Sequence, residues 1–145
     1  MSIVDDLLAS SGLYIGVDRV VGSELIGSAR MVVTPLPGGA GVTLDYEVFN
    51  PSSPGPVRGH AEHTVLGRAH AGGLVMVIAD THAGGLVVLR ETDPGVFEPG
   101  PEGSPYPMKV VVSMPAPGRL NHHWWYGRPG DVATPRDLAE LTLVT

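Results

Sequence analysis

Hydrophobic and polar residues alternate with a period of two along most of this chain, which is typical of β-strands. Segments rich in glycine and proline separate the alternating stretches, as at 35–41, 50–56 and 99–107. The strands predicted from this pattern are 14–21, 24–34, 42–49, 57–66, 74–79, 86–91, 108–114, 120–126 and 138–144, with a brief extended piece at 96–97.

The first residues follow a different pattern. Ser2 and Asp5 have the spacing of a capping box, in which each side chain accepts a hydrogen bond from the other residue's backbone N–H. Hydrophobic residues recur at helical spacing between residues 3 and 8, and Gly12 follows as a stop. The sequence therefore predicts one short N-terminal helix of about two turns.

Many short strands with short connections favour an antiparallel sheet, because a parallel pair needs a long crossover between its strands. The predicted fold class is all-β: an antiparallel barrel of about 8–10 strands with a short N-terminal helix. A length of 145 residues suits one domain, which we expect to cover residues 1–145.

Three predicted strands are apolar on both faces, at 74–79, 86–89 and 110–112. A strand of an isolated barrel should alternate, so something is expected to cover the outer face. The preferred explanation is a homodimer in which sheets pack against each other. The alternative is a flattened, sandwich-like barrel whose own loops give the cover.

Composition and charge exclude several classes of function. The net charge is -6, so a basic patch for nucleic acid is not expected. The absence of cysteine excludes disulfides, thiolate metal sites and cysteine nucleophiles. The start lacks a basic region, and the apolar runs are short for a membrane span, so we expect a cytoplasmic protein that does not associate with membranes.

Side chains two apart on a strand share a face, and this rule sorts the polar residues. One choice of face turns the following set into the barrel: Tyr46, His60, Glu62, Asp80, His82, His122, Trp124 and Tyr126, with Met76 beside Asp80. The opposite choice turns His63, His123 and Trp125 inward instead. The period alone does not decide between the two.

Two kinds of chemistry are compatible with the inward set. His60 with Glu62, and Asp80 with His82, form pairs of potential ligands for iron, manganese or zinc, but the H-x-H spacing of cupin barrels is absent. We predict no metal site on this pattern. Alternatively, Glu62 or Asp80 beside His60 could transfer a proton, because burial raises the pKa of a carboxyl group and a histidine partner lowers it.

These three residues, His60, Glu62 and Asp80, are the candidate catalytic groups. The simpler interpretation is a hydrogen-bonded ion pair that only satisfies buried polar groups.

Aromatic residues gather at 122–126, where two tryptophans are adjacent and must face opposite sides of a strand. Large rigid rings with one polar atom suit a pocket for a flat ligand. The candidate ligand-binding residues are Tyr46, Met76, His122, Trp124 and Tyr126. Ordinary packing in the core and at an interface is the alternative.

Gly12, Tyr14 and Gly16 open the first predicted strand after the helix. This arrangement resembles the calycin barrels, which include lipocalins, fatty-acid-binding proteins and nitrobindin-like haem barrels. The G-x-W-x-G-x-G motif of nitrobindins is matched at the first two glycines, whereas Tyr14 replaces the tryptophan and Asp18 the last glycine. Bacterial lipocalin-like proteins are similar at 45–47, 59–60 and 79–80.

The resemblance implies a barrel that holds a small molecule. In nitrobindins a histidine of a late strand binds haem iron, which implies His122 or His123 here and makes haem a possible cofactor. The function expected is therefore binding of a small apolar or aromatic molecule in the barrel. The alternative is a small barrel enzyme, an isomerase, cyclase or haem-dependent activity, that uses a buried carboxylate and histidine.

Overall fold

The computed structural model describes residues 2–50, 57–81 and 83–145, so the predicted site residue His82 lies outside the described residues. In chain order the elements are α1 (Ile3–Ala9), β1 (Gly12–Val20), β2 (Ile26–Pro35), a 3-10 turn (Pro37–Gly39), β3 (Gly41–Asn50), β4 (Val57–Arg68), β5 (Leu74–Asp80), β6 (Val87–Asp93), β7 (Val96–Pro99), β8 (Met108–Ala116), β9 (Arg119–Tyr126) and β10 (Thr134–Leu143).

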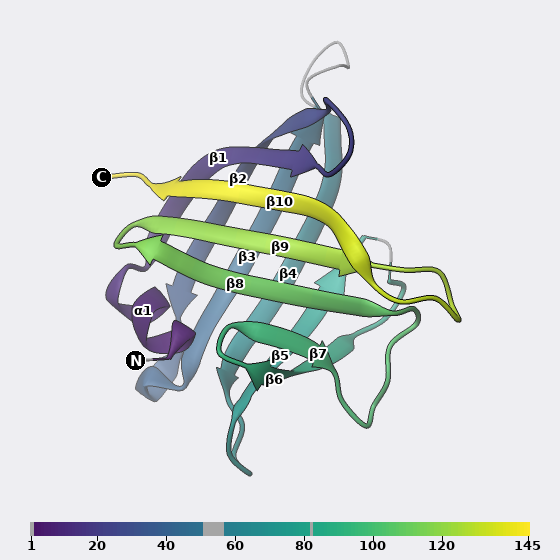
Figure 1. Cartoon of the computed structure of the whole chain (residues 1–145). Coiled ribbons are helices and arrows are strands. Elements are labelled where there is room, and N and C mark those ends of the chain that lie inside the picture. The colour runs from purple at the N-terminus through teal and green to yellow at the C-terminus, as the bar shows by residue number, and fades with distance from the viewer. Residues whose placement is uncertain (1, 51–56, 82) are drawn as a thin grey trace.

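Within the described residues the strands form one closed antiparallel barrel (Figure 1). Each strand pairs with its neighbours in sequence, and β1 pairs with β10 to close the ring. Closure gives each of these strands a partner on both sides, although β7 and β8 pair only at Val96 with Val111 and Phe97 with Val110. The prediction of an all-β antiparallel barrel with a short N-terminal helix is confirmed.

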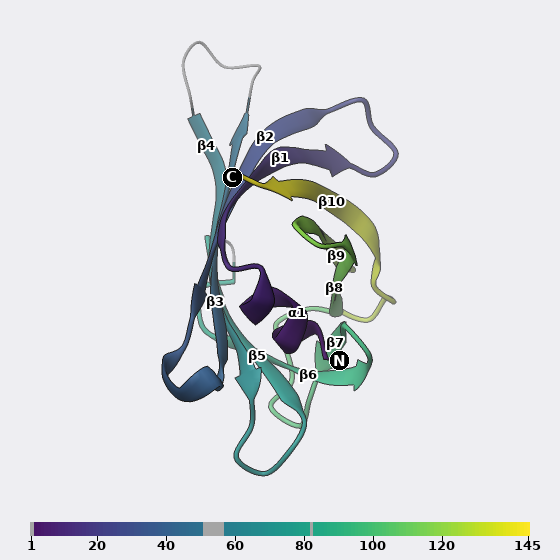
Figure 2. The same ribbon diagram turned by 90° about the vertical axis from the view of Figure 1, so that its left-hand side faces the viewer.

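Helix α1 closes one end of the barrel, as Figure 2 shows. Its capping box is present: the Ser2 hydroxyl accepts from the Asp5 N–H at 3.2 Å, and the Asp5 carboxylate accepts from the Ser2 N–H at 3.0 Å. Ile3, Val4 and Leu7 are buried and contribute to the core. The helix therefore begins where the sequence predicts and covers the apolar interior at what we call the closed end.

The interior next to α1 is a solid hydrophobic core. Alternate residues of the strands supply it, namely Met31, Val42, Leu44, Leu66, Met76, Ile78, Leu89, Phe97, Val110 and Leu120. Because successive antiparallel strands reverse direction, the β1–β2, β5–β6, β7–β8 and β9–β10 connections all lie at the other end. We call this the open end.

The last strand begins earlier than the sequence predicted. The sequence predicts a last strand from residue 138, but β10 starts at Thr134, which pairs with Tyr126. The register shifts between Pro135 and Asp137. Such an irregularity changes which face of the sheet the side chains on either side of it point to. Asp137 consequently pairs with Trp124 and belongs to the barrel wall.

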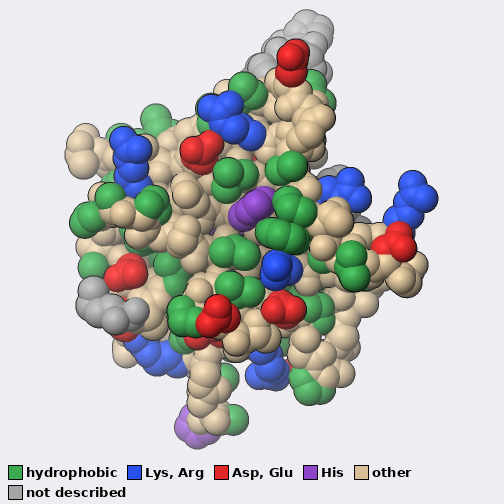
Figure 3. All heavy atoms as spheres, in the orientation of Figure 1, with side chains coloured by type: hydrophobic (Ala, Val, Ile, Leu, Met, Phe, Trp, Pro, Cys, Tyr) green, Lys and Arg blue, Asp and Glu red, His purple; other side chains and the backbone are tan. Residues whose placement is uncertain are grey.

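The outer face of the barrel carries apolar side chains, as the doubly apolar strands predicted. Val77, Val88 and Val111 are half-buried on this face, and the Lys109 ammonium lies 3.8 Å from the centre of the Trp125 ring. Figure 3 shows hydrophobic side chains and a histidine gathered over one side of the barrel. The homodimer stays a prediction.

In the described part of the chain, no helix combines the length and the apolar character needed to cross a membrane. The cytoplasmic location and the single domain stay predictions.

Gly16 allows β1 and β10 to approach closely enough to close the barrel. It pairs with Leu141, and a Cβ placed on Gly16 would lie 1.9 Å from the carbonyl oxygen of Glu140. We expect Gly16→Ala to lower the free energy of unfolding by roughly 2–3 kcal/mol, measured by urea denaturation, because the clash is with backbone. Gly85→Ala is the matched control, since nothing lies within 4 Å of its added Cβ. Equal stability of the two variants would contradict this account of the closure.

Candidate functional site

A cavity of about 730 Å³ lies at the open end of the barrel. The β1–β2 turn, the open-end portions of β3 to β5, the segment before β8 and the junction of β9 with β10 form its lining. Val20, Leu25 and Ile26 line its mouth and are 37%, 62% and 43% exposed. The barrel thus holds a packed core at one end and an accessible, partly apolar cavity at the other.

The strand register sets polar residues opposite one another across the interior. Tyr46 pairs with Glu62, and Glu62 pairs with Asp80, which forms a row across β3, β4 and β5. On the other side of the barrel, Asp137 pairs with Trp124 across β10 and β9. Paired residues share a face of the sheet, so both rows point inward.

A hydrogen bond spans the interior between the two rows. The indole Nε1 of Trp124 donates to Glu62 Oε2 at 2.9 Å, and Thr64 Oγ1 donates to Glu62 Oε1 at 3.0 Å. His60 Nε2 lies 3.5 Å from Glu62 Oε2. Donors thus surround the Glu62 carboxylate, whose side chain is 2% exposed. The hydrogen bond from Trp124 to this carboxylate holds the indole ring in place.

Asp18 and Asp137 form a second polar group, which we call the carboxyl pair. Tyr46 donates its hydroxyl to Asp18 Oδ2 at 2.6 Å. Burial raises the pKa of Asp18, and burial together with the charge of Asp18 raises the pKa of Asp137 to about 6. The two carboxyls are close enough to influence each other's proton affinity. The charge of Asp18 thus helps Asp137 to keep its proton to a higher pH than a solvent-exposed aspartate would.

His60 faces the same cavity. Burial lowers its pKa, but the hydrogen bond to Glu62 and the charges of Glu62 and Asp80 raise it, and the net effect is a raised pKa. The charge of His60 in turn lowers the pKa values of Asp18 and Asp137. The cavity therefore contains acidic and basic groups whose proton affinities depend on one another.

His122 is fully buried and lies behind the cavity. Its ring stacks on Trp124 with the ring centres 3.9 Å apart. Both ring nitrogens lack a hydrogen-bond partner among the described residues. Burial lowers the pKa of His122 to about 4, so the ring is neutral near pH 7.

Four aromatic rings line the cavity: Tyr46, Tyr106, Trp124 and Tyr126. Tyr46 and Trp124 lie 4.8 Å apart between ring centres, and Tyr106 meets Tyr126 edge to face at 5.6 Å. Such faces offer large apolar contact area with a few polar atoms at the edges.

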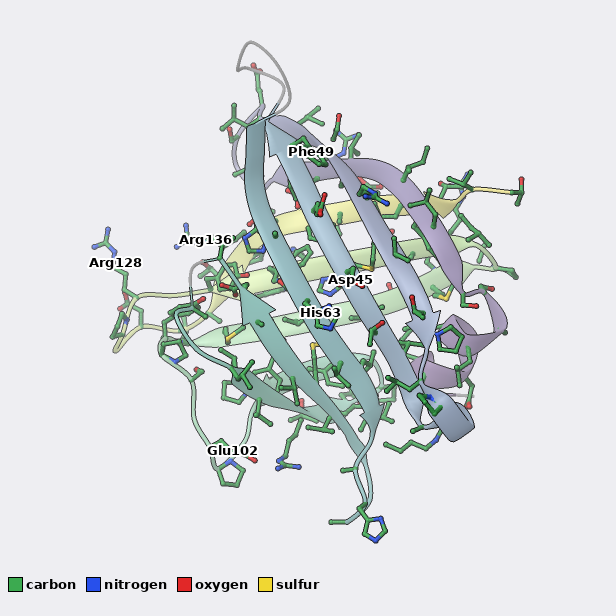
Figure 4. All side chains as sticks on the ribbon, turned by 180° about the vertical axis from the view of Figure 1, so that it is seen from behind. Asp45, Phe49, His63, Glu102, Arg128 and Arg136 are labelled. Carbon is green, nitrogen blue, oxygen red and sulfur yellow. The ribbon has the colours of Figure 1, made fainter. Side chains whose placement is uncertain are left out.

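The structure brings five of the predicted site residues to the cavity lining: Tyr46, His60, Asp80, Trp124 and Tyr126. Glu62 lies behind this lining, and Met76 and His122 are buried in the core. The opposite choice of face is wrong, because His63 is exposed on the outer wall, where it pairs with Asp45 (Figure 4). The catalytic and ligand-binding roles stay predictions.

Sequence reasoning missed Asp18, Glu24, Tyr106 and Asp137 as lining residues. Asp18 follows Tyr14 and Gly16 at alternate positions, so the period placed it inside, but it was considered only as a departure from a motif. Asp137 alternates with Ala139 and Leu141, which are buried, but the predicted strand began at residue 138 and so left it out. Tyr106 belongs to a proline-rich connection without a period.

The residues do not fit the haem that the resemblance implies. His122 is not among the residues that line the cavity. His123 lies on the outer face of β9, between His122 and Trp124, which point inward. The described lining residues include acidic side chains but no lysine or arginine to pair with haem propionates. Among the described residues, no group of three or more histidine or carboxylate side chains is placed to hold a metal ion.

No protein-family model matches the chain, and no curated protein is similar to it in sequence.

The buried imidazole of His122 makes a pH-dependent contribution to stability. In the unfolded chain this group takes up a proton below about pH 6.5, whereas the folded protein resists protonation until about pH 4. The free energy of unfolding therefore decreases as the pH falls from about 6.5 to about 4. We expect His122→Leu to gain on the order of 2 kcal/mol relative to the original protein between pH 8 and pH 5.

Urea denaturation at the two pH values measures this gain. The same substitution at His70, which is exposed, controls for the loss of a histidine in general. A difference in stability for His122→Leu that is the same at both pH values would contradict a neutral, buried imidazole.

Proposed function

We propose that this protein binds a small, largely apolar or aromatic molecule in the cavity at the open end of the barrel. One observation carries the proposal: a cavity of about 730 Å³ in a barrel that is otherwise packed. Pockets for small molecules typically measure about 300–1,000 Å³ and are mostly apolar with a few polar groups. This cavity has that size and that composition.

The architecture supports a single direction of access. Helix α1 and the hydrophobic core fill the closed end, so a ligand enters between the connections of the open end. The apolar residues Val20, Leu25 and Ile26 line this entrance and are partly exposed. An apolar ligand thus gains contact area as it moves inward.

The calycin resemblance belongs to this proposal. An up-and-down barrel with a helix across one end supports it, as does Gly16, which matches a glycine of the nitrobindin motif. Fold alone does not determine the ligand, so the chemistry of the lining has to do so.

A small barrel enzyme is the second candidate, and the carboxyl pair favours it. Asp18 and Asp137 share the cavity with His60, and their proton affinities are coupled. Groups of this kind transfer protons near neutral pH. The predicted catalyst Glu62 would then act by positioning His60 and Trp124, because its carboxylate already accepts hydrogen bonds from the protein.

Binding can be measured with the uncharged dye N-phenyl-1-naphthylamine, which fluoresces in apolar surroundings. We expect one dye molecule per chain, with energy transfer from Trp124, which lines the cavity. Val48→Trp should weaken binding by about tenfold or more by filling the cavity. If Val48→Trp does not fold, Val20→Trp at the mouth replaces it.

Val88→Trp is the matched control, because it adds the same side chain to the outer face of β6. Dye binding that is absent from the original protein, or that survives both cavity substitutions, contradicts the proposal. Mass spectrometry of ligand recovered after long incubation separates the two candidate functions: an unchanged molecule supports binding, and a converted one supports the enzyme.

A further inference from the structure

Resting on the proposed function, we propose that the natural ligand is an organic cation: an apolar molecule with a protonated amine that Asp18 and Asp137 hold among the aromatic rings of the cavity. The proposal names a ligand class that differs from the neutral or anionic lipids an apolar barrel would otherwise suggest. Three observations support this ligand class: the charge of the cavity lining, its aromatic rings, and the direction in which the nearby arginines point.

The charge of the lining is strongly unbalanced. Asp18, Glu24, Asp80 and Asp137 line the cavity, whereas His60 is the one basic side chain among its described lining residues. Even with His60 protonated and one proton shared within the carboxyl pair, negative groups remain in excess. A ligand carboxylate would be repelled here, and an ammonium group would be attracted.

The arginines next to the carboxyl pair in sequence make their contacts elsewhere, although the charge of Arg136 lowers the pKa of Asp137 as the smallest of the influences on it. Arg19 follows Asp18 but points to the outer face, where its guanidinium contacts Glu140 at 3.0 Å. Arg136 precedes Asp137 and is exposed, with its Nε 3.5 Å from the carbonyl oxygen of Tyr126. Figure 4 shows the labelled Arg136 at the margin of the barrel, away from its interior.

The aromatic lining suits the same kind of group. Tyr46 donates its hydroxyl to Asp18, which places its ring next to the carboxyl pair. Trp124 pairs with Asp137 across β9 and β10 and also lines the cavity. A cation near such ring faces gains attraction in addition to its contact with carboxylates. The apolar remainder of the ligand would then lie toward Val20, Leu25 and Ile26 at the mouth.

Three probes that share one ring system test the proposal: 1-naphthylmethylamine, 1-naphthalenemethanol and 1-naphthoic acid. They differ in a single group, which is cationic, neutral or anionic at pH 7.5. We expect isothermal titration to show the amine bound about tenfold or more tightly than the alcohol, with the acid weakest. An alcohol that binds as tightly as the amine overturns the proposal.

The double variant Asp18→Asn with Asp137→Asn tests which groups hold the amine. An amide oxygen at position 18 can still accept the Tyr46 hydroxyl, so we expect the fold and the affinity for the alcohol to be retained. The preference for the amine should fall about tenfold, to the level of the alcohol. Asp45→Asn with Asp93→Asn is the matched control, because it removes the same charge from exposed positions that do not line the cavity.

The outcomes distinguish a failure of the organic-cation proposal from a failure of the proposed binding function. If the uncharged dye binds the cavity but the amine has no advantage, binding stands and the organic cation is wrong. If neither the dye nor any of the three probes binds, the binding function itself is wrong. An amine preference that survives the double variant overturns the assignment to the carboxyl pair. The three-probe comparison needs only the original protein, so it decides the ligand class even if the double variant does not fold.

Discussion

The interior of this protein is organised by the hydrogen bond from Trp124 to Glu62. A buried carboxylate is costly unless donors surround it, and here Trp124, Thr64 and His60 do so. The bond joins β9 to β4, which are not neighbours in the barrel, so it fixes a polar layer across the lumen. On one side of this layer the side chains pack into a core, and on the other they leave a cavity.

This layer also explains why the polar groups of the cavity differ in character. Glu62 is held by protein donors and serves the structure, whereas Asp18 and Asp137 face the cavity with Tyr46 and each other as partners. Two carboxyl groups close together resist being ionised at once. The pair therefore differs from Glu62, whose carboxylate is surrounded by hydrogen-bond donors of the protein.

The fold was largely predictable from the sequence, because a period of two and turns rich in glycine and proline report directly on strands and their connections. The capping box of Ser2 and Asp5 likewise located the helix. The same period grouped Tyr46, Glu62, Asp80 and Trp124 in one candidate inward set, but it did not decide which face of the strands points inward. It could not identify the cavity, because the depth of a side chain along the barrel depends on the register between strands. Asp137 was missed because the predicted strand began one residue after it, although it alternates with the buried Ala139 and Leu141.

The pairing of the first strand with the last has a consequence for how the chain acquires its structure. Tyr14 and Leu143 are partners in the ring, although almost the whole sequence separates them. During synthesis, the emerging chain must therefore keep two open sheet edges until β10 leaves the ribosome. Contacts so distant in sequence slow folding and leave those edges free to pair with other chains. Truncation at the C-terminus should accordingly be felt at both ends of the molecule, because it would leave β1 without its neighbour.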